Sequence, residues 1–346
     1  MVVERYGEPL VPIDLPEPAV PAGYALLEVR TCGVCFSDVK TSRGMMPFSD
    51  QLRLPHVPGH EIFGRVLRTN PPELVAEGLR ASVFHYWPCG RCAACRRGDE
   101  TLCTRLQGWI GFTDPGGFRE RIAVPVDRLV TIPAEIGDVE AALMTCALGT
   151  AYRSVVTRGG VRAGSRIAVI GLGGVGIHAA QVARAAGARV VGFDVSDVAL
   201  AAAARLGLDA RRSDEADAIG SLFEQMDGEG VDVALDTVGL GETLDMAVDA
   251  IRPGGRVVCV GYLPTSSFTI PTSRIVLGEI DVIGSRFAHR DDLERAVALV
   301  ASGAVRPVVG MVRPLEEVND VFEALDAGTV AGRAVLDVVG LNRRAS

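Results

Sequence analysis

Four cysteines lie close together in the first third of the chain and could bind one metal ion. They are Cys89, Cys92, Cys95 and Cys103, in the pattern C-x-x-C-x-x-C followed by seven residues and the last cysteine. Four thiolates in a tetrahedron are typical of structural zinc, which keeps no coordination position open for a substrate. Two disulfides or four free thiols are the alternatives, but in a reducing compartment such clusters are more often metal ligands. The spacing therefore predicts a structural zinc site.

Three further residues could hold a second, catalytic metal. Cys35 lies in the segment C-G-V-C-F-S-D, His60 lies in G-H-E, and Cys146 follows later in the chain. Two thiolates and one imidazole leave the fourth position of a zinc ion open, as catalysis requires. A single histidine or cysteine is more often a packing residue, so the hypothesis depends on their combination with the other motifs.

A glycine-rich segment of the pattern G-x-G-x-x-G indicates a dinucleotide site. It follows an apolar stretch at 166–171 and precedes a helical stretch at 177–186. Glycines allow the backbone to approach a pyrophosphate, and the helix N-terminus offers free N–H groups and positive dipole charge. A glycine-rich turn without a cofactor is the alternative. The glycines expected at the pyrophosphate are Gly171, Gly173, Gly174 and Gly176.

Asp194 indicates which dinucleotide is bound. It ends the next apolar stretch, 18 positions after Gly176. Its carboxylate can accept hydrogen bonds from the adenosine ribose hydroxyls and would repel the additional phosphate of NADP. No arginine occurs among the three residues that follow Asp194. We therefore expect NAD(H), with NADP less favoured.

These motifs must be positioned by two different kinds of structure. Up to about residue 133 the chain has short β-rich stretches interrupted by Pro and Gly, which indicates a mostly β lobe. Beyond about residue 146, apolar strands alternate with Ala-rich helices, the pattern of a parallel sheet covered on both faces. The strands expected here are 166–171, 188–194, 231–236, 255–261 and 280–284. A helix over 291–302 and a strand over 334–338 should return to the first lobe.

Composition excludes several other classes of protein. The chain has 346 residues, which suits two domains, and is 48% hydrophobic and 23% charged, as in folded proteins. A formal charge of −8 disfavours nucleic acid and anionic membranes as partners. No apolar run reaches the ~20 residues of a spanning helix, and the first residues show no secretory signal. We expect a cytoplasmic protein.

Taken together, these motifs resemble those of the zinc-containing medium-chain alcohol dehydrogenases over nearly the whole chain. The family's C-x-[ST]-D is met at 35–38, its G-H-E at 59–61 and its four-cysteine loop without a gap; Cys146 lies where the family carries its third zinc ligand. The resemblance implies an α/β fold in which a Rossmann domain with a doubly wound parallel sheet, 148–289, is inserted in a mostly β, GroES-like catalytic domain, 1–147 with 290–346. It also implies two zinc ions per subunit and a homodimer or homotetramer.

The resemblance further implies roles for individual residues in a reversible transfer of hydride between an alcohol and NAD. Catalytic zinc would be held by Cys35, His60 and Cys146, and Ser37 would accept the hydroxyl proton. Asp38 should hold a ligand in place, and Glu61 should do likewise or bind zinc transiently. Residues implied to contact the cofactor are Thr150 and Val175, beside the nicotinamide, and Arg333, at the pyrophosphate; simple packing or a surface charge is the alternative for these three.

The chain departs from the family at a position that bears on catalysis. Many members have a histidine three residues after the relay hydroxyl, where this chain has Lys40, and a lysine of ordinary pKa, about 10.4, is a poor base at neutral pH. Either its pKa is lowered or protons leave through water.

His85, Tyr86 and Trp87 lie where the family lines its substrate pocket. Aromatic side chains there suit a bulky or aromatic substrate, and core packing is the alternative.

Two other functions remain open at this point. Zinc-bearing members of the same superfamily reduce activated C=C bonds, such as those of enals or enoyl-CoA thioesters, as acryloyl-CoA reductases do. Other members have become non-catalytic, zinc-stabilised nucleotide-binding proteins. The sequence does not identify the substrate, although a small alcohol or carbonyl compound is expected.

Overall fold

The computed structural model describes residues 1–215 and 217–341, which form two compact units. The first unit comprises residues 1–146 and the chain from Val309 onward, and the second comprises residues 147–308. The first break falls one residue from its predicted position. Within the described residues, no helix is both long and apolar enough to cross a lipid bilayer.

The prediction that residues 290–308 return to the first domain is wrong. Helix α10 (Arg290–Ala301) belongs to the second unit, where it packs against α4 (Gly149–Tyr152). Asp292 at its start forms a buried ion pair with Arg153, with Nη1 and Oδ2 3.0 Å apart. The chain therefore re-enters the first unit only at Val309. Sequence reasoning failed here because an amphipathic helix does not indicate which neighbouring surface covers its apolar side.

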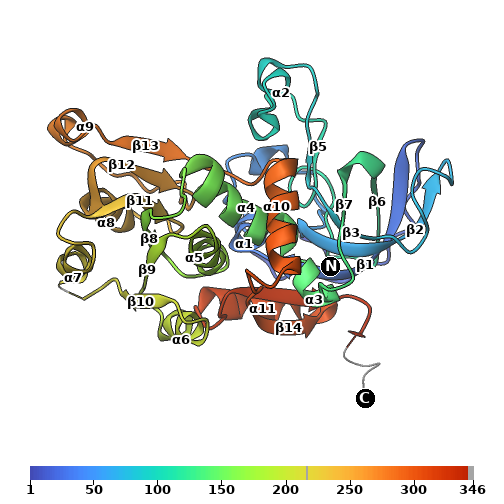
Figure 1. Ribbon diagram of the computed structural model, residues 1–346. Helices are drawn as coiled ribbons and strands as arrows, with labels where there is room; N and C mark the ends of the chain where they lie inside the picture. Colours follow the sequence, from blue (N-terminus) through green and yellow to red (C-terminus); the bar gives the residue numbers. More distant parts are fainter. Residues whose placement is uncertain (216, 342–346) are drawn as a thin grey trace. The chain divides into compact units, whose positions relative to one another are not determined.

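The first unit is built around a mostly antiparallel sheet with strand order β14-β15-β1-β2-β3-β7, and β6 pairs with β1 (Figure 1). A short pair, β4-β5, lies apart from it. The strands are β1 (Tyr24–Val34), β2 (Glu61–Asn70), β3 (Arg80–Val83), β4 (Tyr86–Trp87), β5 (Gly108–Trp109), β6 (Arg121–Pro125), β7 (Leu129–Thr131), β14 (Val309–Pro314) and β15 (Arg333–Asp337). The helices are α1 (Phe36–Ser42), α2 (Ala93–Arg96), α3 (Asp138–Ala141) and α11 (Val318–Asp326).

The core of the first unit is formed by the central strands and by α11. Leu27 and Val29 of β1 and Ile62 and Val66 of β2 are buried and pack with Val321 of α11 in one cluster. Strand β1 pairs with β2, β6 and β15, so it is held along its length. Helix α1 begins just beyond the end of this strand, and its first residues are therefore fixed by the sheet.

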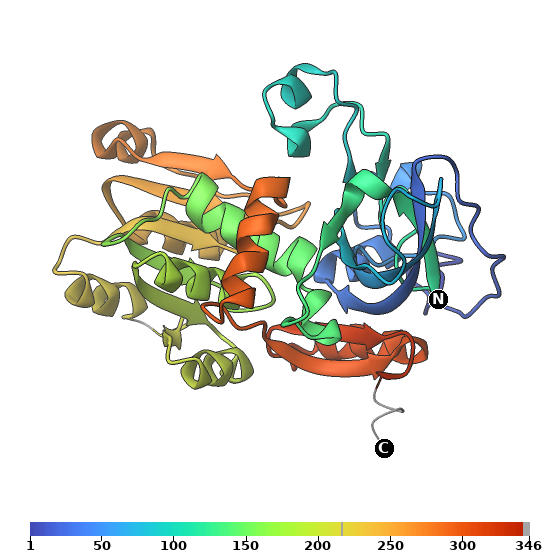
Figure 2. The same cartoon turned by 45° about the vertical axis from the view of Figure 1, so that its right-hand side comes forward.

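The second unit contains a parallel sheet with strand order β10-β9-β8-β11-β12-β13 (Figure 2). Its strands are β8 (Arg166–Ile170), β9 (Arg189–Asp194), β10 (Asp209–Arg212), β11 (Val231–Asp236), β12 (Ile251–Cys259) and β13 (Asp281–Gly284). Its remaining helices are α5 (Gly176–Ala185), α6 (Asp197–Arg205), α7 (Ala218–Gln225), α8 (Gly241–Ala250) and α9 (Thr272–Gly278). The predicted parallel sheet is confirmed, whereas β10 was not predicted.

The strand order reverses between β8 and β11. From β8 the chain forms its neighbour β9 and then the edge strand β10. It then returns to the other side of β8, where it forms β11, and continues through β12 to β13. In open parallel sheets, ligands bind beyond the carboxyl ends of the strands at such a reversal. The glycine-rich segment follows β8 directly and thus lies at this point of the sheet.

Candidate functional site

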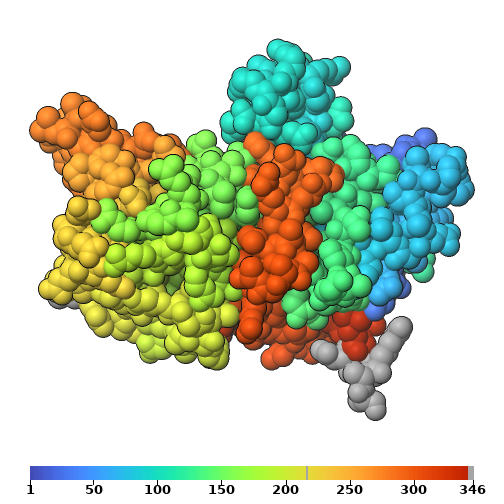
Figure 3. Space-filling model, in the orientation of Figure 1, coloured from blue at the N-terminus to red at the C-terminus, as the bar shows by residue number. Residues whose placement is uncertain are grey.

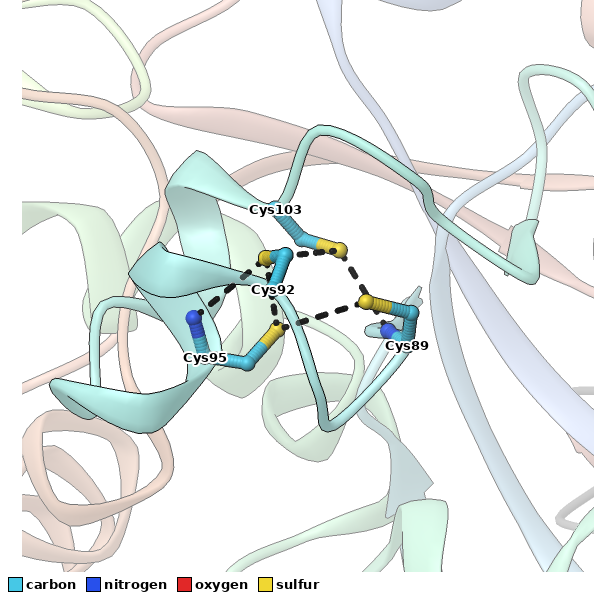
Figure 4. Close-up of side chains that lie close together, drawn as sticks. All are labelled: Cys89, Cys92, Cys95 and Cys103. Atoms are coloured by element: carbon cyan, nitrogen blue, oxygen red, sulfur yellow. Dashed lines mark hydrogen bonds between the residues drawn. The ribbon is translucent and has the colours of Figure 1, made fainter.

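The four cysteines of the predicted structural metal site converge around one point (Figure 4). The Sγ atoms of Cys92 and Cys95 are 3.4 Å apart, those of Cys92 and Cys103 are 3.9 Å apart, and those of Cys89 and Cys95 are 4.0 Å apart. Cys92 caps the N-terminus of α2, and its Sγ accepts a hydrogen bond from the backbone N–H of Cys95 at 3.5 Å. The α2 turn thus orients two of the four sulfurs.

The surroundings of these sulfurs suit a bound cation. Backbone N–H groups lower the pKa of Cys92 to about 5, whereas burial and neighbouring thiols raise the pKa of Cys95 to about 12. The loop has little apolar surface to bury and forms a distinct lobe of the first unit, drawn in teal in Figure 3. Four sulfurs within 4.8 Å of one another satisfy a tetrahedral ion and leave it no open position.

A second group of metal-binding side chains forms in the first unit from distant parts of the sequence. One ligand atom from each of Cys35, His60, Glu61 and Cys146 lies within 4.8 Å of the others. Cys35 directly precedes α1, His60 directly precedes β2, and Glu61 is the first residue of β2. Cys146 lies in a π-helical turn, Met144–Leu148. Irregular helical turns of this type occur frequently at functional sites. The three ligands predicted from sequence are therefore brought together, with Glu61 beside them.

Asp38 fixes the orientation of two of these ligands. Its Oδ1 lies 3.0 Å from Nδ1 of His60, and its Oδ2 accepts a hydrogen bond from the backbone N–H of Cys35 at 2.8 Å. Because Nδ1 is engaged by the carboxylate, Nε2 of His60 is the nitrogen that faces the thiols. Nε2 is buried and has no hydrogen-bond partner among the described residues, which fits a metal ligand.

The titratable groups of this cluster have shifted pKa values. Burial alone would lower the pKa of His60, but the Asp38 carboxylate raises it to about 10. A hydrogen bond from the Cys146 thiol holds the pKa of Cys35 well below its usual range, and the same contact, together with burial, raises the pKa of Cys146. A metal ion bound by these groups would have to displace protons from them.

Ser37 lies at the edge of this cluster. The Oγ of Ser37 is 3.6 Å from the Sγ of Cys35, and Ser37 is half-buried. Its backbone carbonyl accepts a hydrogen bond from the Oγ of Thr41 at 2.8 Å, within the same helix. A hydroxyl in this position is close enough to the ligand group to exchange a proton with a substrate bound there.

Glu61 and Arg333 form an ion pair beside the ligands. Nε of Arg333 lies 3.3 Å from Oε1 of Glu61, and both side chains are buried. Gly33 of β1 pairs with Glu61 of β2, and a Cβ at Gly33 would lie 2.3 Å from Oε2 of Glu61. Glycine at position 33 thus provides the space for the carboxylate. Burial raises the pKa of Glu61 to about 7, although the positive charge of Arg333 acts to lower it. The expected contact of Arg333 with a pyrophosphate stays a prediction.

The glycine-rich segment of the second unit joins β8 to α5. A Cβ at Gly176, the first residue of α5, would lie 1.7 Å from the carbonyl oxygen of Gly171. The helix can therefore approach the turn this closely only with glycine at that position. Val175 directly precedes α5, and Gly173 is exposed. The backbone N–H groups at this helix start are available to an anionic ligand.

Asp194 ends β9 and supports the same turn. Its Oδ2 accepts a hydrogen bond from the backbone N–H of Leu172 at 2.6 Å, and its Oδ1 accepts one from Ser196 at 2.8 Å. The carboxylate is thus fixed at the edge of the glycine-rich segment, where a ribose attached to a bound pyrophosphate would extend. Thr150, in α4 of the second unit, is buried.

Sequence reasoning missed the ring that packs on His60, the histidine predicted to bind metal. The ring of Phe112 lies 4.7 Å from that of His60, and Trp109 lies 4.5 Å from Phe112. His85, noted from sequence, contacts His60 edge-on at 5.5 Å. The pattern around Phe112, a glycine before it and a threonine after it, reads as an ordinary turn. Only the fold shows that this aromatic group surrounds the imidazole.

Comparisons with known proteins agree with this geometry. The family model described as "Alcohol dehydrogenase GroES-like domain" matches residues 21–134, and the model described as "Zinc-binding dehydrogenase" matches residues 174–302. An alcohol dehydrogenase from Geobacillus stearothermophilus is 34% identical over 339 residues, which are 97% of this chain and 98% of that protein.

Solved structures resemble the chain over a similar extent. The crystal structure of AibC has a TM-score of 0.88 at 34% identity, covering 97% of this chain and 94% of that chain. The crystal structure of an NAD-dependent alcohol dehydrogenase has a TM-score of 0.90 at 29% identity, covering 97% and 98%. Both units of the chain are therefore represented in these relatives.

Proposed function

The chain belongs to the zinc-binding alcohol dehydrogenase family, and from this premise we propose that it oxidises an alcohol reversibly to an aldehyde or ketone with NAD as the hydride acceptor. One observation carries the proposal. Cys35, His60 and Cys146 converge in a buried cluster whose histidine is oriented by Asp38. The buried Nε2 of His60 and the two thiols match the donor set of a catalytic zinc ion with one open position.

Zinc held by these three residues would supply positive charge that lowers the pKa of a substrate hydroxyl. The chain's own residues would orient the imidazole and transfer the proton. Asp38 keeps the imidazole in the tautomer that presents Nε2. The half-buried Ser37 accepts the hydroxyl proton at its Oγ as its own hydroxyl proton passes towards solvent. Bound NAD would supply the hydride acceptor, so that oxidation would remove one proton and one hydride from the alcohol.

The second unit contributes the cofactor site in this proposal. The segment 171–176 would receive the pyrophosphate at the start of α5, and Asp194 would accept hydrogen bonds from the adenosine ribose. The position of the Asp194 carboxylate, bonded to the backbone of the same segment, supports a preference for NAD over NADP. The NAD-dependent alcohol dehydrogenase among the similar structures supports the same preference.

An assay with alternative substrates tests the proposal. Zinc-loaded protein is incubated with NAD and a broad panel of primary and secondary alcohols, and in parallel with NADH and a ketone, an enal or an enoyl thioester. We expect NADH formation from at least one alcohol and its reversal with the matching carbonyl compound. Oxidation of NADH with the enal or thioester alone would make the protein a C=C reductase. NADH binding without turnover on any substrate would make it a non-catalytic binding protein.

A further inference from the structure

His178 lies in α5, two residues beyond the glycine-rich segment, and is completely buried. A buried imidazole needs hydrogen-bond partners for its two ring nitrogens. Nδ1 lies 2.7 Å from the carbonyl oxygen of Gly174, and Nε2 lies 2.8 Å from the backbone nitrogen of Val308. One side chain therefore connects the proposed pyrophosphate turn with a distant segment of the same unit.

These two partners determine the protonation of the imidazole. The backbone N–H of Val308 can only donate a hydrogen bond, so Nε2 accepts it and carries no proton. The carbonyl of Gly174 can only accept, so Nδ1 carries the proton. His178 is thus a neutral imidazole in one tautomer, and its N–H points at the glycine-rich turn.

The contact with Gly174 fixes the direction of a backbone N–H group. The carbonyl of Gly174 and the N–H of Val175 belong to one planar trans peptide group and point in opposite directions. This peptide follows two consecutive glycines, Gly173 and Gly174, and glycine has the least restricted torsions of any residue type. A hydrogen bond on the carbonyl therefore holds the Val175 N–H, at the start of α5, in one orientation.

The carbonyls on either side of this one are held by the backbone. Those of Gly173 and Val175 accept hydrogen bonds from the backbone N–H groups four residues further on, at 3.1 and 2.9 Å. The carbonyl between them, that of Gly174, accepts the ring N–H of His178 at 2.7 Å. Three successive carbonyls of the turn are thus held, and the orientation of the middle one depends on which side chain occupies position 178.

The other ring nitrogen is bonded to the last residues of the second unit. Gln181, three residues further along α5, donates from its Nε2 to the carbonyl of Arg306 and accepts from the N–H of Arg306 at its Oε1, both at 2.9 Å. Residues three apart lie on the same face of a helix, so His178 and Gln181 together fix the segment 306–308 along α5. This segment in turn keeps the imidazole from rotating away from the turn.

We propose that His178 is a positioning residue for the cofactor, an inference that rests on the dinucleotide site of the proposed function. Through the Gly174 carbonyl, the imidazole directs the Val175 N–H towards the pyrophosphate of NAD(H). In this role His178 does not touch the cofactor. Its effect should therefore appear with any ligand that carries the pyrophosphate, whether or not a hydride is transferred.

Two substitutions separate the two ring nitrogens. The side-chain amide of asparagine reaches the place of Nδ1 and that of glutamine the place of Nε2, so His178→Asn keeps the donor for Gly174 and His178→Gln keeps the acceptor for Val308. Dissociation constants of NADH and of ADP-ribose, which has the pyrophosphate but no nicotinamide, are measured on full-length zinc-loaded protein. We expect His178→Gln to weaken both ligands by about 3- to 10-fold, the loss of one ordinary hydrogen bond, and His178→Asn to stay within about twofold of the parent. Parental affinity in His178→Gln would overturn the proposal.

The matched control is Gln181→Met. It removes the two hydrogen bonds to Arg306 from the same face of α5 without touching the glycine-rich turn. Its melting temperature should fall, whereas its affinities for NADH and ADP-ribose should remain those of the parent. Equal weakening of both ligands in His178→Asn, His178→Gln and Gln181→Met would reflect a general loss of structure and would overturn the proposal.

The tautomer can be observed in the unsubstituted chain. The chain has five histidines, and in protein labelled with ¹⁵N-histidine the imidazole signals of His178 are those that disappear in His178→Gln. We expect them to show a protonated Nδ1 and an unprotonated Nε2. A proton on Nε2 would overturn the proposal.

The outcomes separate this role from the proposed function. If the parent binds NADH and the two His178 variants differ as expected, but no alcohol is oxidised, the proposed function fails and the role of His178 stands. If the parent oxidises an alcohol and His178→Gln binds ADP-ribose as tightly as the parent, only the role of His178 is overturned. A parent that binds neither NADH nor ADP-ribose would overturn both.

Discussion

The carboxylate of Asp38 and the imidazole of His60 lie 3.0 Å apart, and neither side chain is exposed to solvent. Among the described residues, this contact acts most directly on the imidazole, because it determines which ring nitrogen faces the thiols. Substituting Asp38→Asn should therefore lower the affinity of the proposed catalytic site for zinc by about 10- to 100-fold, as loss of a carboxylate behind a histidine ligand does. Competition with a chelator measures this change.

The control for that variant is Asp50→Asn, which removes a carboxylate from an exposed position. Its zinc affinity should match the parent's within error. If Asp38→Asn also keeps the parent's affinity, the carboxylate does not orient the ligand, and the role assigned to Asp38 is wrong.

Zinc uptake should depend on pH in a defined direction. In the metal-free protein, the pKa of His60 is raised from its ordinary value of 6.5 to about 10, so its ion pair with Asp38 stabilises the fold fully below pH 6.5. This stabilisation is lost as the pH rises through 10. Zinc must displace the proton, and its affinity should therefore increase from pH 6.5 to pH 9 with net proton release. An affinity that is constant over this range would contradict the assignment of His60.

Cys35→Ala should abolish turnover while leaving NADH binding intact. Cys35 belongs to the metal cluster of the first unit, whereas the glycine-rich segment and Asp194 belong to the second. Turnover should fall by at least ~10³-fold, since Lewis-acid stabilisation worth several kcal/mol is lost. NADH fluorescence titration should give the parent's dissociation constant. Retained turnover would show that the metal ligands have been misassigned.

Cys95→Ala should act on stability first. The four-cysteine loop depends on its sulfurs for a fixed structure, and the free energy of metal binding becomes folding free energy. We expect the melting temperature to fall by about 5–10 °C, the shift that follows from a loss of a few kcal/mol. The matched control is Cys259→Ala, which removes a half-buried thiol outside both clusters. Equal melting temperatures for Cys95→Ala and the parent would contradict a structural role.

Asp194→Gly should shift the cofactor preference towards NADP. The substitution removes the charge that would repel the additional phosphate, but it also removes the acceptor for the backbone N–H of Leu172. Asp194→Asn separates these effects, because its side-chain oxygen can still accept that hydrogen bond. Both variants should raise the ratio of kcat/KM for NADP to that for NAD, by about 5- to 30-fold for a repulsion of about 1–2 kcal/mol. An unchanged ratio in both would exclude Asp194 from cofactor discrimination.

The features that sequence predicted well are those fixed by local spacing. The four cysteines fall within one loop, and the glycine-rich segment lies between an apolar strand and a helix, so chain connectivity alone brings their atoms together. The parallel sheet followed from apolar runs such as Val231–Asp236. Strand β10, Asp209–Arg212, escaped prediction because it is an edge strand without a buried apolar run.

The features that escaped prediction depend on register between distant strands. Gly33 of β1 lies opposite Glu61 of β2 on one side and Val335 of β15 on the other. This double pairing brings Arg333, at the start of β15, to the Glu61 carboxylate. Pairing register is set by the whole sheet, and the sequence around Arg333 alone does not reveal it.

The zinc content of three purified proteins tests the central claim most directly. The account predicts two zinc ions per chain in the parent, one in Cys35→Ala with the four-cysteine site still filled, and one in Cys95→Ala with the Cys35–His60–Cys146 site still filled. A single zinc ion in the parent that persists in Cys35→Ala and disappears in Cys95→Ala would contradict the account, because the proposed chemistry would then lack its metal.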